Sequence, residues 1–181
     1  MATQNGERRR AALVTGASYG IGYATAVGLA QDGFDVAVSD LTTDTLARTV
    51  ADITAAGGKA AALALDLRVQ ASVERAIADA AAAFGGLDVL VNNAGVPSLG
   101  KPAVEITRAE WEGNIGINLT GTFFMSATMG RYLIGEKRPG MRNQPGIDAW
   151  CGRVRRRICL RHRQGGDQPH DADAGDRVGP A

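Results

Sequence analysis

Cysteine and long hydrophobic runs are scarce in this sequence of 181 residues. Two cysteines cannot supply the disulfide framework of a small secreted protein. No apolar run approaches the roughly 20 residues of a membrane-spanning helix, and no hydrophobic stretch of signal-peptide type follows the charged start. A cytoplasmic location without a membrane partner is therefore expected. The 20 basic and 19 acidic side chains nearly cancel, which argues against a nucleic-acid partner.

The last 41 residues differ in composition from the first 140. Residues 141–181 contain eight Arg, five Asp, both cysteines and both histidines. They lack Ser, Thr, Glu, Lys, Phe and Tyr, all of which occur in the first part. We therefore divide the chain into two parts. Residues 1–140 carry the strand and helix patterns described next, and residues 141–181 are expected to have no fold of their own.

Short apolar runs alternate with helical patterns across residues 1–140. The expected strands are 11–15, 35–40, 59–65 and 87–91, and the expected helices are 21–31, 43–56, 70–84 and a region in two pieces from 107 to about 136. Strands that alternate with helices of 10 to 15 residues are typical of βαβ units. The fold class predicted from this pattern is α/β, with a doubly wound parallel sheet.

Three glycines occupy the turn between the first strand and the first helix. They are Gly16, Gly20 and Gly22, in the segment Thr-Gly-Ala-Ser-Tyr-Gly-Ile-Gly. Gly16 permits a tight turn, Gly20 lets the backbone approach a ligand, and Gly22 lets the helix pack against the sheet. Backbone N–H groups and the positive end of the helix dipole can hold a pyrophosphate at such a turn. The alternative is that the glycines serve the geometry of the turn alone.

Asp40 ends the second expected strand. A carboxylate in this position can accept hydrogen bonds from both hydroxyls of an adenosine ribose, and it would repel a 2′-phosphate. Tyr19 stands in the glycine turn where a cation for that phosphate could otherwise lie. The two residues favour NAD as the cofactor over NADP. The alternative for Asp40 is a solvated residue that caps the next turn.

Together with three further segments, these residues resemble the short-chain dehydrogenase/reductase family. The segments are Asp66-Leu67, Asn92-Asn93-Ala94-Gly95, and Asn118 within Ile117-Asn118-Leu119-Thr120-Gly121. The resemblance covers about residues 11–137. It implies a Rossmann-type sheet with strand order 3-2-1-4, followed by strands that this chain does not supply. It also implies hydride exchange between NAD(H) and a small-molecule secondary alcohol or ketone, in relatives that form homo-oligomers.

The resemblance also implies roles for individual residues. The implied cofactor-binding residues are Gly16, Ser18, Gly20, Ile21, Gly22, Asp40, Asp66, Leu67, Asn92, Ala94 and Gly95. The Asn92 amide would tie neighbouring strands, while Ala94 and Gly95 keep the surface low beside the cofactor. Asn118 would be the catalytic asparagine, in a helix whose backbone is loosened so that a carbonyl can hold a water. The glycines that would favour this loosening are Gly113, Gly116 and Gly121.

The family's catalytic serine and its Tyr-x-x-x-Lys pair are missing. The tyrosine would act as general acid or base, the lysine would lower its pKa, and the serine would orient the carbonyl. This chain has no Ser or Tyr after Tyr132 and no Lys after Lys137. We therefore expect weak cofactor binding and no turnover.

The genetic code offers a reason for the missing residues. In a frame shifted by one base, the last two bases of each tail codon are read with the first base of the next codon. Leu160 followed by Arg then allows Tyr, and Gln164 followed by Gly gives Lys or Arg. In the same frame, Ile147 followed by Asp allows Ser, thirteen positions before the restored tyrosine. This spacing is the one the family requires, so the tail resembles the family's active-site segment after a frameshift, by a gene error or a sequencing error.

Two other motifs in the tail carry little weight. Cys151, Cys159, His162 and His170 have the residue types of a zinc site, but their spacing matches no zinc pattern, so no metal is expected. The arginines between 153 and 163 lack the interleaved aromatics of a nucleic-acid surface. Two functional hypotheses remain: a dehydrogenase whose gene reads through in the other frame, and a non-catalytic nucleotide-binding fragment.

Overall fold

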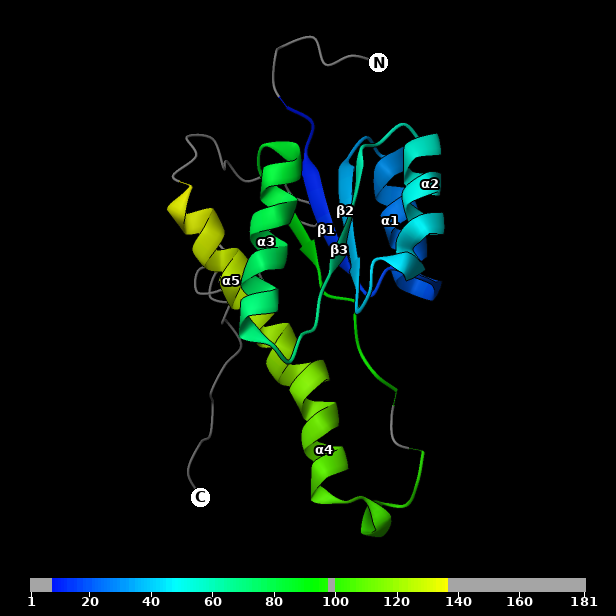
Figure 1. Ribbon diagram of the computed structural model, residues 1–181, viewed down its shortest axis with the longest axis vertical. Coiled ribbons are helices and arrows are strands. Elements are labelled where there is room, and N and C mark those ends of the chain that lie inside the picture. Colours follow the sequence, from blue (N-terminus) through cyan, green and yellow to red (C-terminus); the bar gives the residue numbers. More distant parts are fainter. Residues whose placement is uncertain (1–7, 98–99, 137–181) are drawn as a thin grey trace, which may run out of the picture.

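A parallel sheet forms the centre of the molecule in the computed structural model, which describes residues 8–97 and 100–136 (Figure 1). Its strands are β1 (Ala11–Thr15), β2 (Asp35–Asp40), β3 (Ala60–Ala64) and β4 (Val89–Val91). They lie in the order β3-β2-β1-β4, which confirms the predicted α/β class and strand order. Strand β1 pairs with β2 from Ala11 opposite Asp35 to Thr15 opposite Ser39, and it pairs with β4 on its other side.

Helices cover both faces of the sheet (Figure 1). They are α1 (Gly20–Gln31), α2 (Ala47–Ala55), α3 (Gln70–Phe84), α4 (Arg108–Ile115) and α5 (Thr122–Gly135), with short 3₁₀ turns at Asp44–Leu46 and Ala103–Glu105. Helices α1 and α2 lie on one face and α3 and α5 on the other, while α4 extends beyond the end of the sheet. The sheet is therefore the middle of three layers.

Alternating side chains of the strands divide the core between the two faces. Leu13 packs with α3 and α5 residues such as Val73 and Met125, whereas Val14 packs with α1 and α2 residues such as Ala26 and Ile53. All of these side chains are fully buried. Burial of a Val or Leu side chain contributes about 1.5–3 kcal/mol, so the apolar strands hold the layers together.

The expected element boundaries are right to within a few residues. Helix α3 covers the expected range, while the helix expected at 43–56 begins with a 3₁₀ turn and becomes α-helical at Ala47. Strand β3 is shorter by one residue at each end. Strand β4 begins at Val89, two residues later than expected. The Leu87 amide donates to the Tyr132 hydroxyl on α5 (3.1 Å), and the Asp88 amide donates to the Ala11 carbonyl oxygen on β1 (2.9 Å).

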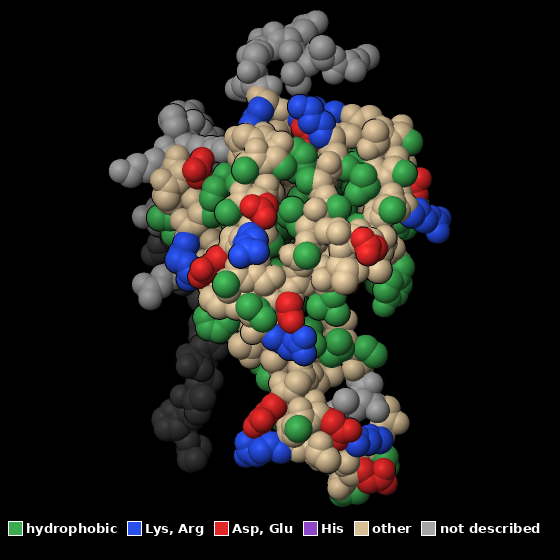
Figure 2. Space-filling model, viewed as in Figure 1, with side chains coloured by type: hydrophobic (Ala, Val, Ile, Leu, Met, Phe, Trp, Pro, Cys, Tyr) green, Lys and Arg blue, Asp and Glu red, His purple; other side chains and the backbone are tan. Residues whose placement is uncertain are grey.

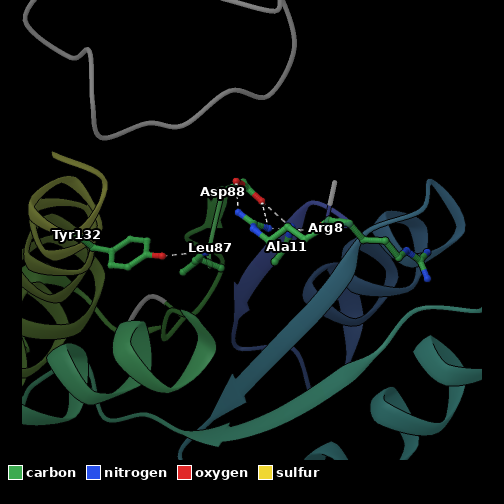
Figure 3. Close-up of polar contacts among 6 residues, drawn as sticks. Arg8, Ala11, Leu87, Asp88 and Tyr132 are labelled. Atoms are coloured by element: carbon green, nitrogen blue, oxygen red, sulfur yellow. Dashed lines mark hydrogen bonds and ion pairs between the residues drawn. The ribbon is translucent and has the colours of Figure 1, made fainter. Parts of the chain in front are cut away.

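A polar cluster joins the amino-terminal ends of β1 and β4 (Figure 3). The Arg8 guanidinium donates to both carboxylate oxygens of Asp88, at 2.8 and 2.7 Å. The same carboxylate accepts from the Ala11 amide at 2.8 Å. Paired N–H donors of this kind fix geometry as well as charge. The cluster lies at the amino-terminal end of the sheet, opposite to the carboxyl ends of the strands.

A π-helix, Gly116–Gly121, joins α4 to α5. Asn118 lies within it, so the loosened backbone expected at this position is confirmed, as is the division of the helical region into two pieces. A Cβ on Gly121 would lie 2.7 Å from the Leu67 Cβ and 2.9 Å from the Leu67 carbonyl oxygen. Glycine therefore allows this end of the π-helix to approach the segment after β3.

Acidic and basic side chains lie beside one another on the face of the molecule in Figure 2. Three ion pairs on the described surface are Arg68–Asp66, Lys101–Glu110 and Arg108–Glu112. No helix in the described ranges is long and apolar enough to cross a membrane. The Cys, His and Arg motifs of 141–181, and the proposed division at residue 140, lie outside the described residues.

Gly22 sets the approach of α1 to the sheet. A Cβ here would lie 2.3 Å from the Gly16 carbonyl oxygen and 2.4 Å from the Asn93 Nδ2, whereas a Cβ on Gly28 in the same helix meets nothing within 4 Å. We predict that Gly22→Ala lowers the free energy of unfolding by about 1–3 kcal/mol through overpacking. Gly28→Ala should raise it by up to about 1 kcal/mol through helix propensity. Urea denaturation followed by circular dichroism measures both, and equal effects of the two variants would contradict the packing role of Gly22.

Glu110 caps the start of α4 and pairs with the loop that follows β4. Its carboxylate accepts from the Lys101 Nζ (2.6 Å) and from the Thr107 amide (2.9 Å) and hydroxyl (2.7 Å). These bonds, the one to Lys101 foremost, lower the pKa of Glu110 from 4.5 to about 2.

We predict that a carbon-13 NMR titration gives Glu110 a midpoint near 2 and that Lys101→Met raises this midpoint. Because the folded-state pKa lies below the unfolded one, the contribution of Glu110 to stability is complete above about pH 4.5 and is lost as the pH falls through about 2. A wild-type midpoint near 4.5 would show that the Lys101 contact does not form in solution.

Candidate functional site

A cavity of about 530 Å³ opens at the carboxyl ends of the strands. Eight of the predicted site residues line it: Gly16, Gly20, Ile21, Asp40, Asp66, Leu67, Ala94 and Gly95. The other four, Ser18, Gly22, Asn92 and Asn118, are not among its lining residues. The cavity includes the point beside β1 where the strand order reverses, which is where open α/β sheets bind ligands.

The glycine turn forms the floor of this cavity. Gly16 and Gly20 both have left-handed backbone conformations, with φ of 62° and 61°. A Cβ on Gly16 would lie 2.7 Å from the Ala94 Cα, so this glycine lets the turn meet the loop after β4. A Cβ on Gly20 would meet nothing within 4 Å. Gly20 therefore borders open space above the turn, where a ligand can approach the backbone.

Helix α1 starts at this turn without a capping side chain. Its N-cap residue, Tyr19, makes no side-chain capping hydrogen bond, and its first turn has no acidic residue. In contrast, α4 begins with a complete capping box made by Thr107 and Glu110. The first N–H groups of a helix need acceptors, and the helix dipole favours a negative one. The start of α1 thus fits an anion such as a pyrophosphate.

Two asparagines, Asn92 and Asn93, follow β4, and their side chains make different contacts. Asn92 was predicted to tie neighbouring strands, and this is wrong, because its Nδ2 donates to the Ser126 hydroxyl on α5 (2.8 Å). Asn93 makes the tie instead. Its Nδ2 donates to the carbonyl oxygens of Thr15 (2.9 Å) and Gly16 (2.8 Å), at the end of β1. Successive residues of a strand point to opposite sides, which is why only one of the two can face the turn.

The Thr15 hydroxyl completes this junction. It accepts hydrogen bonds from the amides of Asn93 and Ala94, both at 3.0 Å. The loop after β4 is thereby fixed to the glycine turn through both backbone and side-chain groups. Thr15 and Asn93 were not predicted as site residues, although Asn93 stands within a motif that the sequence analysis singled out.

The Asp40 carboxylate lies on the cavity wall at the end of β2. One oxygen accepts from the Ser18 hydroxyl (2.5 Å), and the other accepts from the Leu41 amide (2.8 Å). An ionised carboxylate offers about four acceptor positions. Two thus stay available beyond these contacts, which suits the two neighbouring hydroxyls of a ribose. The 3₁₀ turn that follows, Asp44–Leu46, has Thr43 as its N-cap residue and no side-chain capping bond, so Asp40 does not cap it, and the cofactor role of Asp40 stays a prediction.

Asp66 follows β3 and faces the same cavity. Its carboxylate accepts from the amide, Nε and Nη2 of Arg68, at 2.9, 3.0 and 2.7 Å. The side-chain hydrogen bond from Arg68 is the main reason why the pKa of Asp66 lies below its usual value. Arg68 also lines the cavity, and sequence reasoning missed it. The sequence offered one signal for Arg68: it is a basic residue two positions after the predicted aspartate.

Asn118 fixes the loop after β4. Its Oδ1 accepts from the Val96 amide (2.8 Å), and its Nδ2 donates to the Val96 carbonyl oxygen (2.9 Å) and to the Asn114 Oδ1 (2.9 Å). The side chain thus replaces a pairing strand for Val96. A Cβ on Gly95 would lie 2.9 Å from the Asn118 Oδ1, so glycine is needed beside it. The catalytic role expected for Asn118 stays a prediction.

The described residues show no group of three His, Cys, Asp or Glu side chains placed to hold a metal. One buried hydroxyl in this range, that of Ser39 on the cavity wall, has no hydrogen-bond partner. Anion-binding amides, a ribose-type carboxylate and an apolar wall beside them fit a dinucleotide.

Comparison with known proteins agrees with this geometry. A sequence model of the family described as short chain dehydrogenase matches residues 10–141. A sorbitol dehydrogenase from Cereibacter sphaeroides is 39% identical over 72% of this chain and 50% of its own length. The chain spans about half the length of the curated relatives it matches.

Solved structures give the same result. A 3-oxoacyl-[acyl-carrier protein] reductase from Brucella melitensis in complex with NAD has a TM-score of 0.68 and 31% identity, over 73% of this chain and 52% of that one. A metagenomic short-chain oxidoreductase in complex with NADP has a TM-score of 0.66 and 33% identity, over 78% and 67%. The chain therefore belongs to the short-chain dehydrogenase/reductase family, whose members are oxidoreductases built on the NAD(P)-binding Rossmann fold described above.

Proposed function

We propose that the described residues bind NAD(H) and that the complete protein exchanges hydride between NAD(H) and a small secondary alcohol or its ketone. The Asp40 carboxylate carries this proposal, because it lies on the cavity wall with acceptor positions for two hydroxyls. The uncapped start of α1 offers N–H donors to the pyrophosphate, which joins the two nucleoside halves of the cofactor. A homo-oligomeric state of the complete protein is part of the same proposal.

The choice of NAD over NADP rests on charge. A 2′-phosphate would lie beside the Asp40 carboxylate, which would repel it. Among the described residues that line the cavity, Arg68 is the one cation, and its guanidinium is engaged with Asp66. Tyr19 occupies the position in the glycine turn where a second cation could stand. These features favour an adenosine ribose with both hydroxyls free.

The chemistry of the proposed reaction needs a proton donor beside the substrate oxygen. The nicotinamide ring supplies or accepts the hydride when the cofactor is bound. Within the described residues, Asn118 would help to place a water for the proton, through the loosened π-helix around it. No tyrosine in the sequence is followed by a lysine four positions later. We therefore propose that the chain with this tail binds the dinucleotide and does not turn over.

The second candidate is a nucleotide-binding protein without catalysis. It is favoured by the same absence of Ser, Tyr and Lys from 141–181. Sequencing of the DNA around codons 138–142 separates the two candidates. If the DNA shows a missing or extra base there, the corrected reading frame encodes the dehydrogenase, and the corrected protein should reduce NAD with an alcohol substrate. An unambiguous read in the present frame would sink the frameshift hypothesis.

Asp40→Ala should weaken NADH binding by tenfold or more, because two hydrogen bonds to a charged group are lost. The affinity for NADPH should stay equal or improve, since the repulsion of the 2′-phosphate is removed. Asp44→Ala, an acidic residue in the exposed 3₁₀ turn after β2, is the matched control. Fluorescence titration of both dinucleotides measures the change. A wild-type preference for NADPH, or unchanged NADH affinity in Asp40→Ala, would contradict the assignment.

A further inference from the structure

We propose that Asn114 is a positioning residue for the nicotinamide half of the cofactor. Together with Asn118, it holds the backbone of Val96 and Pro97 in the loop after β4. The hold on this loop sets the part of the cavity wall against which that half of the dinucleotide would pack. The inference rests on the proposed function, since it requires NAD(H) to occupy the cavity.

A continuous chain of hydrogen bonds runs through the two asparagines. The Val96 amide donates to the Asn118 Oδ1 (2.8 Å), and the Asn118 Nδ2 donates to the Val96 carbonyl oxygen and to the Asn114 Oδ1 (both 2.9 Å). The Asn114 Nδ2 in turn donates to the Pro97 carbonyl oxygen (3.0 Å). The chain begins and ends on the backbone of the same loop, so the two side chains together hold two consecutive residues of it.

The groups at the two ends of this chain fix which way each amide points. A backbone N–H can only donate and a carbonyl oxygen can only accept, so Asn118 presents Oδ1 to the Val96 amide and Asn114 presents Nδ2 to Pro97. The Asn118 Nδ2 then meets the Asn114 Oδ1, and every contact pairs a donor with an acceptor. Position 114 thus needs a side chain that both accepts and donates. An amide does so, whereas a carboxylate or an apolar group does not.

The asparagines continue a polar side of α4 that faces the same loop. Glu110, Asn114 and Asn118 are spaced by four residues, which places neighbouring members on one side of a helix. The Glu110 carboxylate accepts from the Lys101 Nζ of the loop (2.6 Å), while the two asparagines contact the loop nearer to β4. Asn114 lies in the middle of this series, and its contact with Asn118 carries the hold on the loop into the π-helix.

The order of the strands places the nicotinamide half on this side of the cavity. In the proposed function, Asp40 at the end of β2 marks the adenosine side, and the start of α1 next to β1 takes the pyrophosphate. Strand β4 lies on the other side of β1, so the second half of the dinucleotide extends toward the loop after β4. Val96 and Ile117 line the cavity there. Val96 is bonded by Asn118, and Ile117 is the residue before it, so both depend on the asparagine chain.

The test compares NADH with ADP, which has the adenosine and pyrophosphate groups of the cofactor but no nicotinamide half. Fluorescence titration of the full chain with NADH, and displacement of NADH by ADP, give the ratio of the two affinities. The wild-type chain should bind NADH more tightly. Asn114→Leu, which is close in size but makes neither hydrogen bond, should lower the ratio by about five- to tenfold. Glu112→Gln, at an exposed position on α4, should leave the ratio unchanged.

Asn114→Asp separates hydrogen-bond donation from polarity. An ionised carboxylate of the same shape can accept from the Asn118 Nδ2 but cannot donate to the Pro97 carbonyl oxygen, so this variant should lower the ratio as Asn114→Leu does. It also keeps the inference testable if Asn114→Leu does not fold.

Hydrogen exchange gives a readout that a purely local role would not move. The Val96 amide donates to Asn118 and not to Asn114. Faster exchange of this amide in Asn114→Leu is therefore expected, because Asn114 acts through Asn118. The Ala94 amide, which is held by the junction at the end of β1, should keep its wild-type rate and serves as the internal control.

Each outcome supports or overturns the inference. Equal weakening of NADH and ADP in Asn114→Leu, or an unchanged exchange rate of the Val96 amide, would mean that Asn114 only supports its helix, and the inference would be overturned. Equal affinity of the wild-type chain for NADH and ADP would also overturn it, while the proposed function would stand. If the wild-type chain bound neither ligand, the proposed function itself would fail.

Discussion

The side-chain amide of Asn93 is the contact on which the site depends. It donates to two consecutive carbonyl oxygens, those of Thr15 and Gly16, and so joins the loop after β4 to the turn after β1. Gly22 has to lack a side chain because its Cβ would overlap the same amide. The position of α1, the shape of the glycine turn and the height of the cavity floor all follow from this junction.

The electrostatics of the cavity follow from two carboxylates in different surroundings. Asp40 accepts two neutral hydrogen bonds and keeps acceptor capacity for hydroxyl groups. Asp66 is held by a guanidinium, which keeps it ionised and limits what it can accept. The uncapped start of α1 adds positive potential at the glycine turn. These groups line one cavity at the carboxyl ends of the strands, and their arrangement suits a nucleotide.

Apolar runs and glycine spacing predicted the parallel sheet and the glycine turn, because both depend on local geometry, whereas the strand order and most of the cavity wall came from the family resemblance. The resemblance also implied a loosened helix at Asn118, and glycines at 116 and 121, which favour it, bracket the π-helix. It assigned the strand tie to Asn92 rather than Asn93, since adjacent residues of one type differ only in the side of the strand they face. Arg68 was missed because its importance depends on a partner two residues away and on the cavity wall that they share.

The central claim is that the dinucleotide lies over the start of α1 and the ends of β2 and β3. A proton–nitrogen NMR spectrum titrated with NADH tests it most directly. The account predicts saturable shifts at the amides of residues 20–22 and 66–68, with the amides of α4 (Arg108–Ile115) unchanged. Saturable binding that left residues 20–22 unshifted would contradict it.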